Sequence, residues 1–264
     1  MPTDYREIPI PLRRDASTTA GYGHVPVDLD SDLSQEPLVP LAEAGVAAES
    51  YYARSDGFNS PYYRALPCAP QTVSCRRSVA LKLREVNQRL EPFGLELLAW
   101  DGYRPIACQR ELWEFFLQKA RQALGEASDL KYSRYASRYC SNPSTFNPAD
   151  PTTWPTHITG GAVDLTLRRI ATGELLNMGG TFDDPSRISH TDFFERWRKG
   201  KLSVSALDAQ RNRRLLYWAM LESDFVNYPF EWWHFDWGTQ MWALKRRPRK
   251  GARAFYGPAD SASG

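Results

Sequence analysis

The stretch PTHITGGAVDLTL, residues 155–167, places one charged side chain inside an apolar run of strand length. Asp164 stands between Val163 and Leu165, both of which are typical of a buried strand. An isolated carboxylate among apolar side chains is too costly for a domain to tolerate. A folded chain therefore protonates the group, pairs it with a positive side chain, or uses it to hold a cation.

His157 precedes Asp164 by seven residues, and the Gly160-Gly161 pair lies between them. Glycine allows the backbone to turn sharply, so both side chains can point to one place. A histidine and a carboxylate that converge in this way are typical of a metal site. The alternative is that Asp164 pairs with an arginine and that His157 caps a turn, and these two residues alone do not distinguish the two.

The composition predicts one decorated globular domain. With 264 residues, 42% of them hydrophobic, the chain can bury one sizeable core or two small ones. The net charge is only +2 and the sequence pI is about 8.3, so no overall field favours nucleic acid as a partner.

No apolar run approaches the roughly 20 residues that a membrane helix requires, so no membrane span is predicted. The N-terminal stretch MPTDYREIPIPLRRDAS lacks the apolar segment of a secretory signal. We therefore expect a cytoplasmic location, with the periplasm as the alternative if a leader was removed. Four cysteines without C-x-x-C spacing suit reduced thiols.

Hydrophobic periodicity predicts three helices and several strands. The helices are expected over 76–90, after the DGYRP turn (101–105) with Pro105 in the first helical turn, and over about 209–223. Strands are expected at LELLAW (95–100), at 162–167 and within YPFEWWHFDWG. Residues 128–155 are expected to form a long loop, a candidate lid or rim. The irregular alternation predicts an α+β fold, a single domain with a mainly antiparallel sheet and helices packed on it.

Three segments are expected along the chain. Residues 1–50 are proline-punctuated and read as an irregular N-terminal arm. Residues 51–244 form the predicted catalytic domain. Residues 245–264 begin with a basic run and end in Gly, Ser and Ala, which indicates a solvated, flexible tail.

The chain contains four histidines, and His234 follows Glu231 by three residues in EWWH. A zinc hydrolase requires three protein ligands, an open position for water and a separate carboxylate that takes the proton of that water. His157, Asp164 and His234 can supply the ligands, and Glu231 can supply the base. A regular strand would place positions 231 and 234 on opposite faces, so we expect a turn near Pro229. The alternative is an aromatic core in which His234 only forms a hydrogen bond.

Arg104 is the fifth candidate residue of the site. It precedes a proline, which favours extended backbone, and it follows the LELLAW strand at a strand-to-helix corner. A guanidinium there could stabilise the oxyanion that forms when a carbonyl is attacked. The alternative is a surface ion pair with Asp101.

Four ordered stretches resemble the motifs of the VanX-type D-alanyl-D-alanine dipeptidases. These stretches are WDGYRP (100–105), HITGGAVDLTL (157–167), NMGGTFDDPSRISH (177–190) and EWWHF (231–235). The family consists of zinc enzymes that are related to D,D-carboxypeptidases and share the fold of the hedgehog signalling domain. The similarity runs from roughly residue 50 to residue 240, and the motifs are specific in combination.

The resemblance implies one zinc ion on His157, Asp164 and His234. It also implies that Glu231 acts as general base and then acid, and that Arg104 polarises the scissile carbonyl. An aspartate of the GTFDD loop, Asp183, is expected to receive the free amine of a dipeptide. For Asp183 the alternative is a turn-capping role.

One position departs from the family pattern, because Pro155 stands where family members usually carry a serine that is associated with substrate binding. The resemblance implies hydrolysis of a small D,D-dipeptide, with D-Ala-D-Ala as the leading candidate. The departure at Pro155 leaves the exact dipeptide preference open. Two alternatives remain: a D,D-carboxypeptidase that trims peptidoglycan stem peptides, and a zinc-stabilised binding module without turnover. The sequence does not indicate the oligomeric state.

Overall fold

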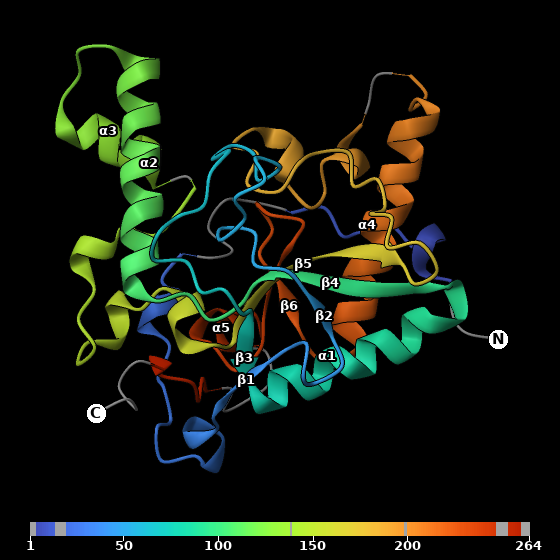
Figure 1. Ribbon diagram of the computed structural model, residues 1–264, viewed down its shortest axis with the longest axis horizontal. Helices are drawn as coiled ribbons and strands as arrows, with labels where there is room; N and C mark the ends of the chain where they lie inside the picture. Colours follow the sequence, from blue (N-terminus) through green and yellow to red (C-terminus); the bar gives the residue numbers. More distant parts are fainter. Residues whose placement is uncertain (1–3, 14–19, 138, 198–199, 247–252, 260–264) are drawn as a thin grey trace.

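The computed structural model describes residues 4–13, 20–137, 139–197, 200–246 and 253–259 (Figure 1). The helices are α1 Arg77–Leu90, α2 Ile106–Leu124, α3 Asp129–Ala136, α4 Val204–Glu222 and α5 Gln240–Lys245. The strands are β1 Leu38–Pro40, β2 Ala47–Ala48, β3 Ser74–Arg76, β4 Leu95–Asp101, β5 Ala162–Arg169, β6 Val226–Asn227 and β7 His234–Asp236. Short 3-10 turns occupy much of the chain between these elements.

The central sheet has the strand order β2-β4-β5-β7-β6, and only its β2–β4 pair is parallel. Helices α1 and α4 pack beside it, whereas α2 and α3 lie together beyond one end (Figure 1). The predicted α+β class with a mainly antiparallel sheet is confirmed.

The alternation of side chains along β5 accounts for the position of its charged residue. Val163 and Leu165 are fully buried in the main hydrophobic core, and they point to the opposite face from Asp164 and Thr166. On the face that carries Asp164, Thr166 lines a hollow together with Tyr51 and Phe182, which lie in irregular segments. The carboxylate therefore lies outside the aliphatic core, on the face where polar groups gather.

Strand register aligns three polar residues across the sheet. Asp101 at the end of β4 is opposite Asp164, and Asp164 is opposite His234 of β7. A register shift between Ala99 and Asp101 precedes this row. Directly opposite residues have neighbouring side chains, so the register alone gathers these groups at one place.

The structure corrects the prediction of an uninterrupted loop over 128–155, because α3 lies within it. This helix packs on α2, where Ala136 joins Trp113 and Phe116 in a small hydrophobic cluster. Its sequence DLKYSRYA has no sustained apolar stripe, so periodicity did not reveal it. Helix α4 also begins earlier than predicted, at Val204 rather than about 209.

The two terminal segments contain more structure than the sequence indicated. Within the expected irregular arm, β1 pairs with β3 and β2 extends the central sheet. In the expected flexible tail, Ala254 forms a β-bridge with Val27, and Tyr256 is fully buried. This part of the tail is therefore packed and not a solvated extension, whereas residues 247–252 and 260–264 lie outside the described part of the chain.

All four cysteines are free. Within the described ranges, none of the helices combines the length and the apolar character that crossing a bilayer requires.

Candidate metal centre and active site

The three predicted ligands meet in a buried group. His157 Nε2 lies 3.1 Å from His234 Nδ1, and His234 Nδ1 lies 3.0 Å from Asp164 Oδ1. His157 Nε2 lies 3.4 Å from Asp164 Oδ2. All three residues are buried, and their ligand atoms lie within 4.8 Å of one another. Of the alternatives that the sequence left open, the pairing of Asp164 with an arginine is present, since Arg104 Nη2 lies 3.3 Å from Asp164 Oδ2. The side chain of His157 does not cap a turn, and His234 has more than one polar contact.

The local chain explains the position of His157. This residue lies in a 3-10 turn, Thr156–Thr159, that ends at Gly160 in the left-handed region (φ 71°). At Gly161 a Cβ atom would lie 2.7 Å from the backbone oxygen of Trp237. Gly160 therefore allows the turn, and Gly161 allows the start of β5 to approach the backbone at Trp237 closely.

The hydrogen bonds of His157 show that this donor set fits a cation. Its Nδ1 lies 2.8 Å from the carbonyl oxygen of Gly102, and because a carbonyl only accepts, the ring proton is on Nδ1. The lone pair of Nε2 then faces His234 Nδ1 and Asp164. Two imidazole nitrogens and a carboxylate oxygen form a donor set that zinc prefers.

Electrostatics favour the anionic form of Asp164, which is the form that binds a cation. Burial opposes ionisation of Asp164, but His157 and His234 outweigh it and hold the pKa of this carboxyl well below its usual value. Arg104 adds a weaker contact, with Nη2 at 3.3 Å from Asp164 Oδ2. The carboxylate of Asp164 is therefore ionised and faces the ring nitrogens of His157 and His234.

Glu231 lies in a turn, as the sequence analysis expected. The amide of Glu231 donates to the carbonyl of Tyr228 at 3.1 Å, and the amide of His234 donates to the carbonyl of Glu231 at 3.4 Å. The carboxylate Oε2 lies 3.9 Å from His234 Nδ1, which is beyond hydrogen-bond distance. Burial raises the pKa of Glu231 to about 8; His234 opposes this change, and the carboxylate of Asp164 adds to it.

Arg104 is buried, and its guanidinium is held on several sides. Nε donates to Asp101 Oδ2 at 2.8 Å, and Nη1 donates to Gln109 Oε1 at 2.9 Å. Nη2 donates to the hydroxyl of Tyr52 at 3.2 Å and points toward Asp164. The pair with Asp101 exists, but it is a buried pair and not the surface pair considered as the alternative.

Asp183 has a left-handed backbone (φ 55°), and its carboxylate Oδ2 accepts hydrogen bonds from Tyr52 and Tyr62 at 2.9 and 2.8 Å. Burial raises the pKa of Asp183 to about 6, and Asp164 adds to this change while Arg104 opposes it. The neighbouring Asp184 caps the turn, because its Oδ1 accepts from the amide of Ser186 at 2.7 Å.

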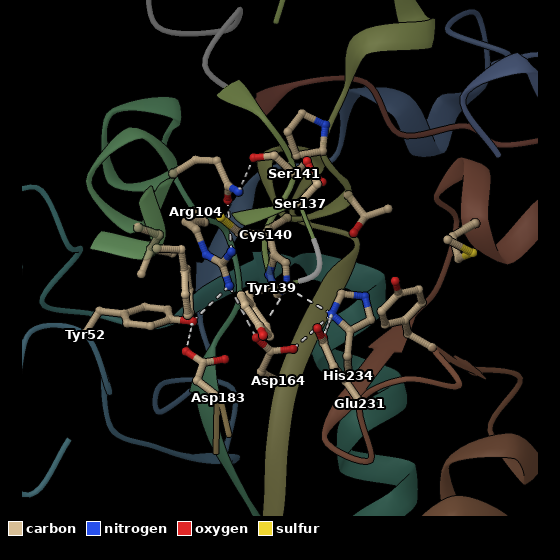
Figure 2. A pocket seen from close by; sticks show the side chains of 18 of the residues that line it. Tyr52, Arg104, Ser137, Tyr139, Cys140, Ser141, Asp164, Asp183, Glu231 and His234 are labelled. Carbon is tan, nitrogen blue, oxygen red and sulfur yellow. Dashed lines mark hydrogen bonds and ion pairs between the residues drawn. The ribbon is translucent and has the colours of Figure 1, made fainter. Parts of the chain in front are cut away.

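These groups line a cavity of about 170 Å³. Figure 2 shows His234 and Glu231 on one side of Asp164, with Arg104, Tyr52 and Asp183 on the other. Pro155 also lines this cavity.

A second cavity of about 510 Å³ shares the side chains of Asp183 and Glu231 with the first. Its farther wall includes Arg187, His190 and Phe230. The first cavity therefore continues into the second beyond Asp183 and Glu231.

Sequence reasoning missed the residues that hold the candidate groups. Tyr52 and Tyr62 contact Asp183 from segments far away in the chain. Gln109 contacts Arg104 from only five residues away, but no local pattern marks any of the three. Asp236 was also missed, although a signal was present. It follows His234 by two residues, and residues i and i+2 of a strand share a face.

The chain matches known peptidases. Residues 35–249 match the Peptidase_M15 family model, described as D-ala-D-ala dipeptidase. A D-alanyl-D-alanine dipeptidase of Enterococcus faecalis is 35% identical over 159 residues, which cover 60% of this chain and 70% of that protein. One of Synechocystis sp. is 30% identical over 234 residues, which cover 84% of this chain and 91% of that protein.

Among solved structures, the vancomycin-resistance D,D-pentapeptidase VanY in complex with Zn(II) is similar with a TM-score of 0.39 and 16% identity. That match covers 69% of this chain and 82% of VanY. The LD-carboxypeptidase LdcB is similar with a TM-score of 0.41 and 15% identity, and the match covers 81% of this chain and 75% of LdcB. Given the extent of the family match and the identity to the two dipeptidases, this chain belongs to the Peptidase_M15 family of D-Ala-D-Ala dipeptidases and is a peptidase enzyme.

Proposed function

We propose that the protein hydrolyses D-Ala-D-Ala to two molecules of D-alanine with one zinc ion per chain. The observation that carries this proposal is the meeting of His157, Asp164 and His234 at the wall of a cavity that also holds Glu231 and Arg104. The printed activity of the similar proteins supports the choice of substrate.

His157 Nε2, an oxygen of Asp164 and His234 Nδ1 would hold the ion, since these are the atoms that face one another. When bound, zinc acts as a Lewis acid that lowers the pKa of water toward about 7 and polarises a carbonyl.

Glu231 is the proposed general base and acid. Its carboxylate lines the cavity and is 3.9 Å from the nearest ligand nitrogen, so it is not itself a ligand. A bound cation would offset the effect of burial and favour the ionised form, which accepts a proton from water. The same group then delivers that proton to the leaving amine. The turn at 228–231 fixes this position, because Asn227 Nδ2 donates to the carbonyls of both Glu231 and His234 at 3.0 Å.

Arg104 is the proposed oxyanion partner. Asp101 and Gln109 hold two edges of its guanidinium, and Nη2 remains directed to the side of the cavity where Asp164 lies. A fixed, buried positive charge stabilises a developing oxyanion without reorganisation during the reaction.

Asp183 is the proposed site for the free amine of the dipeptide. It lies across the cavity from His234 and is held by two tyrosine hydroxyls. An ionised carboxylate in this position would pair with the ammonium group of the substrate.

A D,D-carboxypeptidase is the second candidate, and the cavity beyond Asp183 and Glu231 favours it. A strict dipeptidase needs that space closed, whereas an enzyme for longer peptides needs it open. Turnover of D-Ala-D-Ala and of a peptide that ends in D-Ala-D-Ala, compared in one assay, separates the two. Turnover of the longer peptide alone would reject the dipeptidase proposal.

A non-catalytic zinc module is the third candidate. A purely structural ion needs neither a base nor a buried arginine at an open cavity, so the site disfavours this alternative. The test is zinc content measured together with D-alanine release from D-Ala-D-Ala. One zinc per chain without hydrolysis of any D,D-peptide would revive the binding module. The cytoplasmic location and the division into arm, catalytic domain and tail stay predictions.

A further inference from the structure

Asp236 is a fully buried carboxylate that faces one of the candidate ligands from behind. Its Oδ2 lies 2.9 Å from His234 Nε2, and its Oδ1 accepts the hydroxyl hydrogen of Thr239 at 2.8 Å. Its exposed fraction is 0%. A buried carboxylate is retained only where its hydrogen bonds compensate for lost hydration.

The fold fixes Asp236 on both sides. His234 and Asp236 are i and i+2 residues of β7, so their side chains lie on one face of the sheet. Asp236 is paired to Ala162 of β5 and to Val226 of β6, which places it in the interior of the sheet. Thr239 is the N-cap of α5, and its hydroxyl accepts from the amide of Trp242 while it donates to Asp236.

Both ring nitrogens of His234 face carboxylates, Nε2 that of Asp236 at 2.9 Å and Nδ1 that of Asp164 at 3.0 Å. A carboxylate only accepts hydrogen bonds, so without a cation either contact can hold the ring proton. With a cation between Asp164 and Nδ1, the proton of a neutral His234 ring lies on Nε2, toward Asp236. The Nδ1 lone pair then faces His157 Nε2 at 3.1 Å and Asp164 Oδ1 at 3.0 Å. His157 has the opposite tautomer, because the carbonyl of Gly102 accepts a hydrogen bond from the proton on Nδ1 and leaves the lone pair on Nε2.

We propose that Asp236 is a positioning residue for the metal centre, and that Thr239 positions Asp236 in turn. Asp236 holds His234 in the tautomer that offers Nδ1 to the ion and makes this nitrogen a stronger donor. The inference rests on the proposed zinc site and extends it to a carboxylate that does not contact the ion.

Zinc affinity of the purified full-length chain, measured by competition with a chelator, tests the role directly. Asp236→Asn keeps the shape of the side chain but weakens the acceptor, and zinc binding is expected to weaken about 10- to 100-fold. Thr239→Val is expected to weaken zinc binding by a smaller factor. Thr239→Ser keeps the hydroxyl and should bind zinc as tightly as the unmodified chain.

Asp192→Asn is the matched control. Asp192 is also buried, but its carboxylate contacts Arg196 and the amide of Arg13 and no candidate ligand. Its substitution is expected to lower thermal stability and to leave zinc affinity unchanged. Equal affinities for Asp236→Asn and the unmodified chain would overturn the inference.

A second measurement does not depend on the folding of any variant. Long-range ¹H–¹⁵N correlation spectra of the zinc-loaded, unmodified chain report which nitrogen of each histidine is protonated. We expect Nε2–H for His234 and Nδ1–H for His157, and a proton on Nδ1 of His234 would contradict the inference. If the unmodified chain binds no zinc at all, the proposed metal centre fails and the role of Asp236 fails with it. If zinc binds but the tautomer or the affinities differ from these expectations, only the role of Asp236 fails.

Discussion

Replacing Arg104 by lysine should separate its structural role from its catalytic role. The guanidinium makes hydrogen bonds to Asp101, Gln109 and Tyr52 and faces Asp164. Lysine keeps the charge but has a single nitrogen, so it cannot maintain contacts on three sides. Two lost hydrogen bonds at about 1 kcal/mol each predict a decrease of about 2 kcal/mol in the free energy of unfolding.

The effect on the reaction should be larger than the effect on stability. If Nη2 stabilises the oxyanion, Arg104→Lys should lower kcat on the order of 10²- to 10³-fold. Arg104→Ala should also destabilise the fold by about 3–5 kcal/mol, because it leaves Asp101 buried without its arginine partner. Chemical denaturation gives the free energy of unfolding, and D-alanine release from D-Ala-D-Ala gives kcat and KM.

Arg214→Lys is the matched control for Arg104→Lys. Arg214 donates from two nitrogens to the carboxylate of Glu195, at 2.6 and 2.7 Å, and does not line the catalytic cavity. Its substitution should cost a comparable free energy of unfolding and leave kcat unchanged. If Arg104→Lys and Arg214→Lys retain the same kcat, Arg104 is a structural residue and the oxyanion assignment is wrong.

Three further predictions concern the base, the metal and the amine site. Glu231→Gln should retain zinc and lose rate on the order of 10²- to 10⁴-fold; wild-type kcat in a zinc-loaded variant would reject Glu231 as the base. Asp164→Asn should lose zinc on dialysis against a weak chelator, and metal analysis showing one ion per chain in that variant would exclude Asp164 as a ligand. Because the pKa of Asp183 is raised to about 6, the carboxyl is protonated below that pH, and KM for D-Ala-D-Ala should rise as the pH falls through about 6. Tyr62→Phe removes a hydrogen bond that lowers this pKa, so it should move the change in KM to higher pH; an unchanged pH profile of KM would contradict the amine assignment.

The parts of the fold that the sequence predicted are those with long, periodic patterns. Helix α1 follows the stripe of Val79, Leu83, Val86 and Leu90, all of which are fully buried. Helix α3 has no such stripe, and its one buried residue, Ala136, packs on α2. Strand β2 has only two residues, and its pairing with β4 could not be inferred from so short a segment.

The aromatic segment YPFEWWHFDWG illustrates a limit of pattern reasoning. Its composition indicated a strand, but only His234–Asp236 pairs in the sheet, and 228–231 forms the turn that directs Glu231 into the cavity. β-Propensity describes how a residue fits a half-buried surface. It does not distinguish a strand from a buried aromatic turn.

The sequence predicted those site residues whose chemical type is unusual among their sequence neighbours. A carboxylate between Val163 and Leu165 requires an explanation, so Asp164 was conspicuous. Tyr52 and Tyr62 are ordinary core residues by type, and their contacts with Asp183 depend on a segment more than a hundred residues away in the chain. Only the folded chain shows that these hydroxyls hold the carboxylate.

Anomalous diffraction at the zinc absorption edge, on crystals of the zinc-loaded chain, tests the central claim most directly. The account predicts one strong peak in contact with His157 Nε2, Asp164 and His234 Nδ1, on the cavity side where Glu231 lies without contacting the ion. A zinc peak elsewhere, or density with these three side chains turned away from one another, would contradict it.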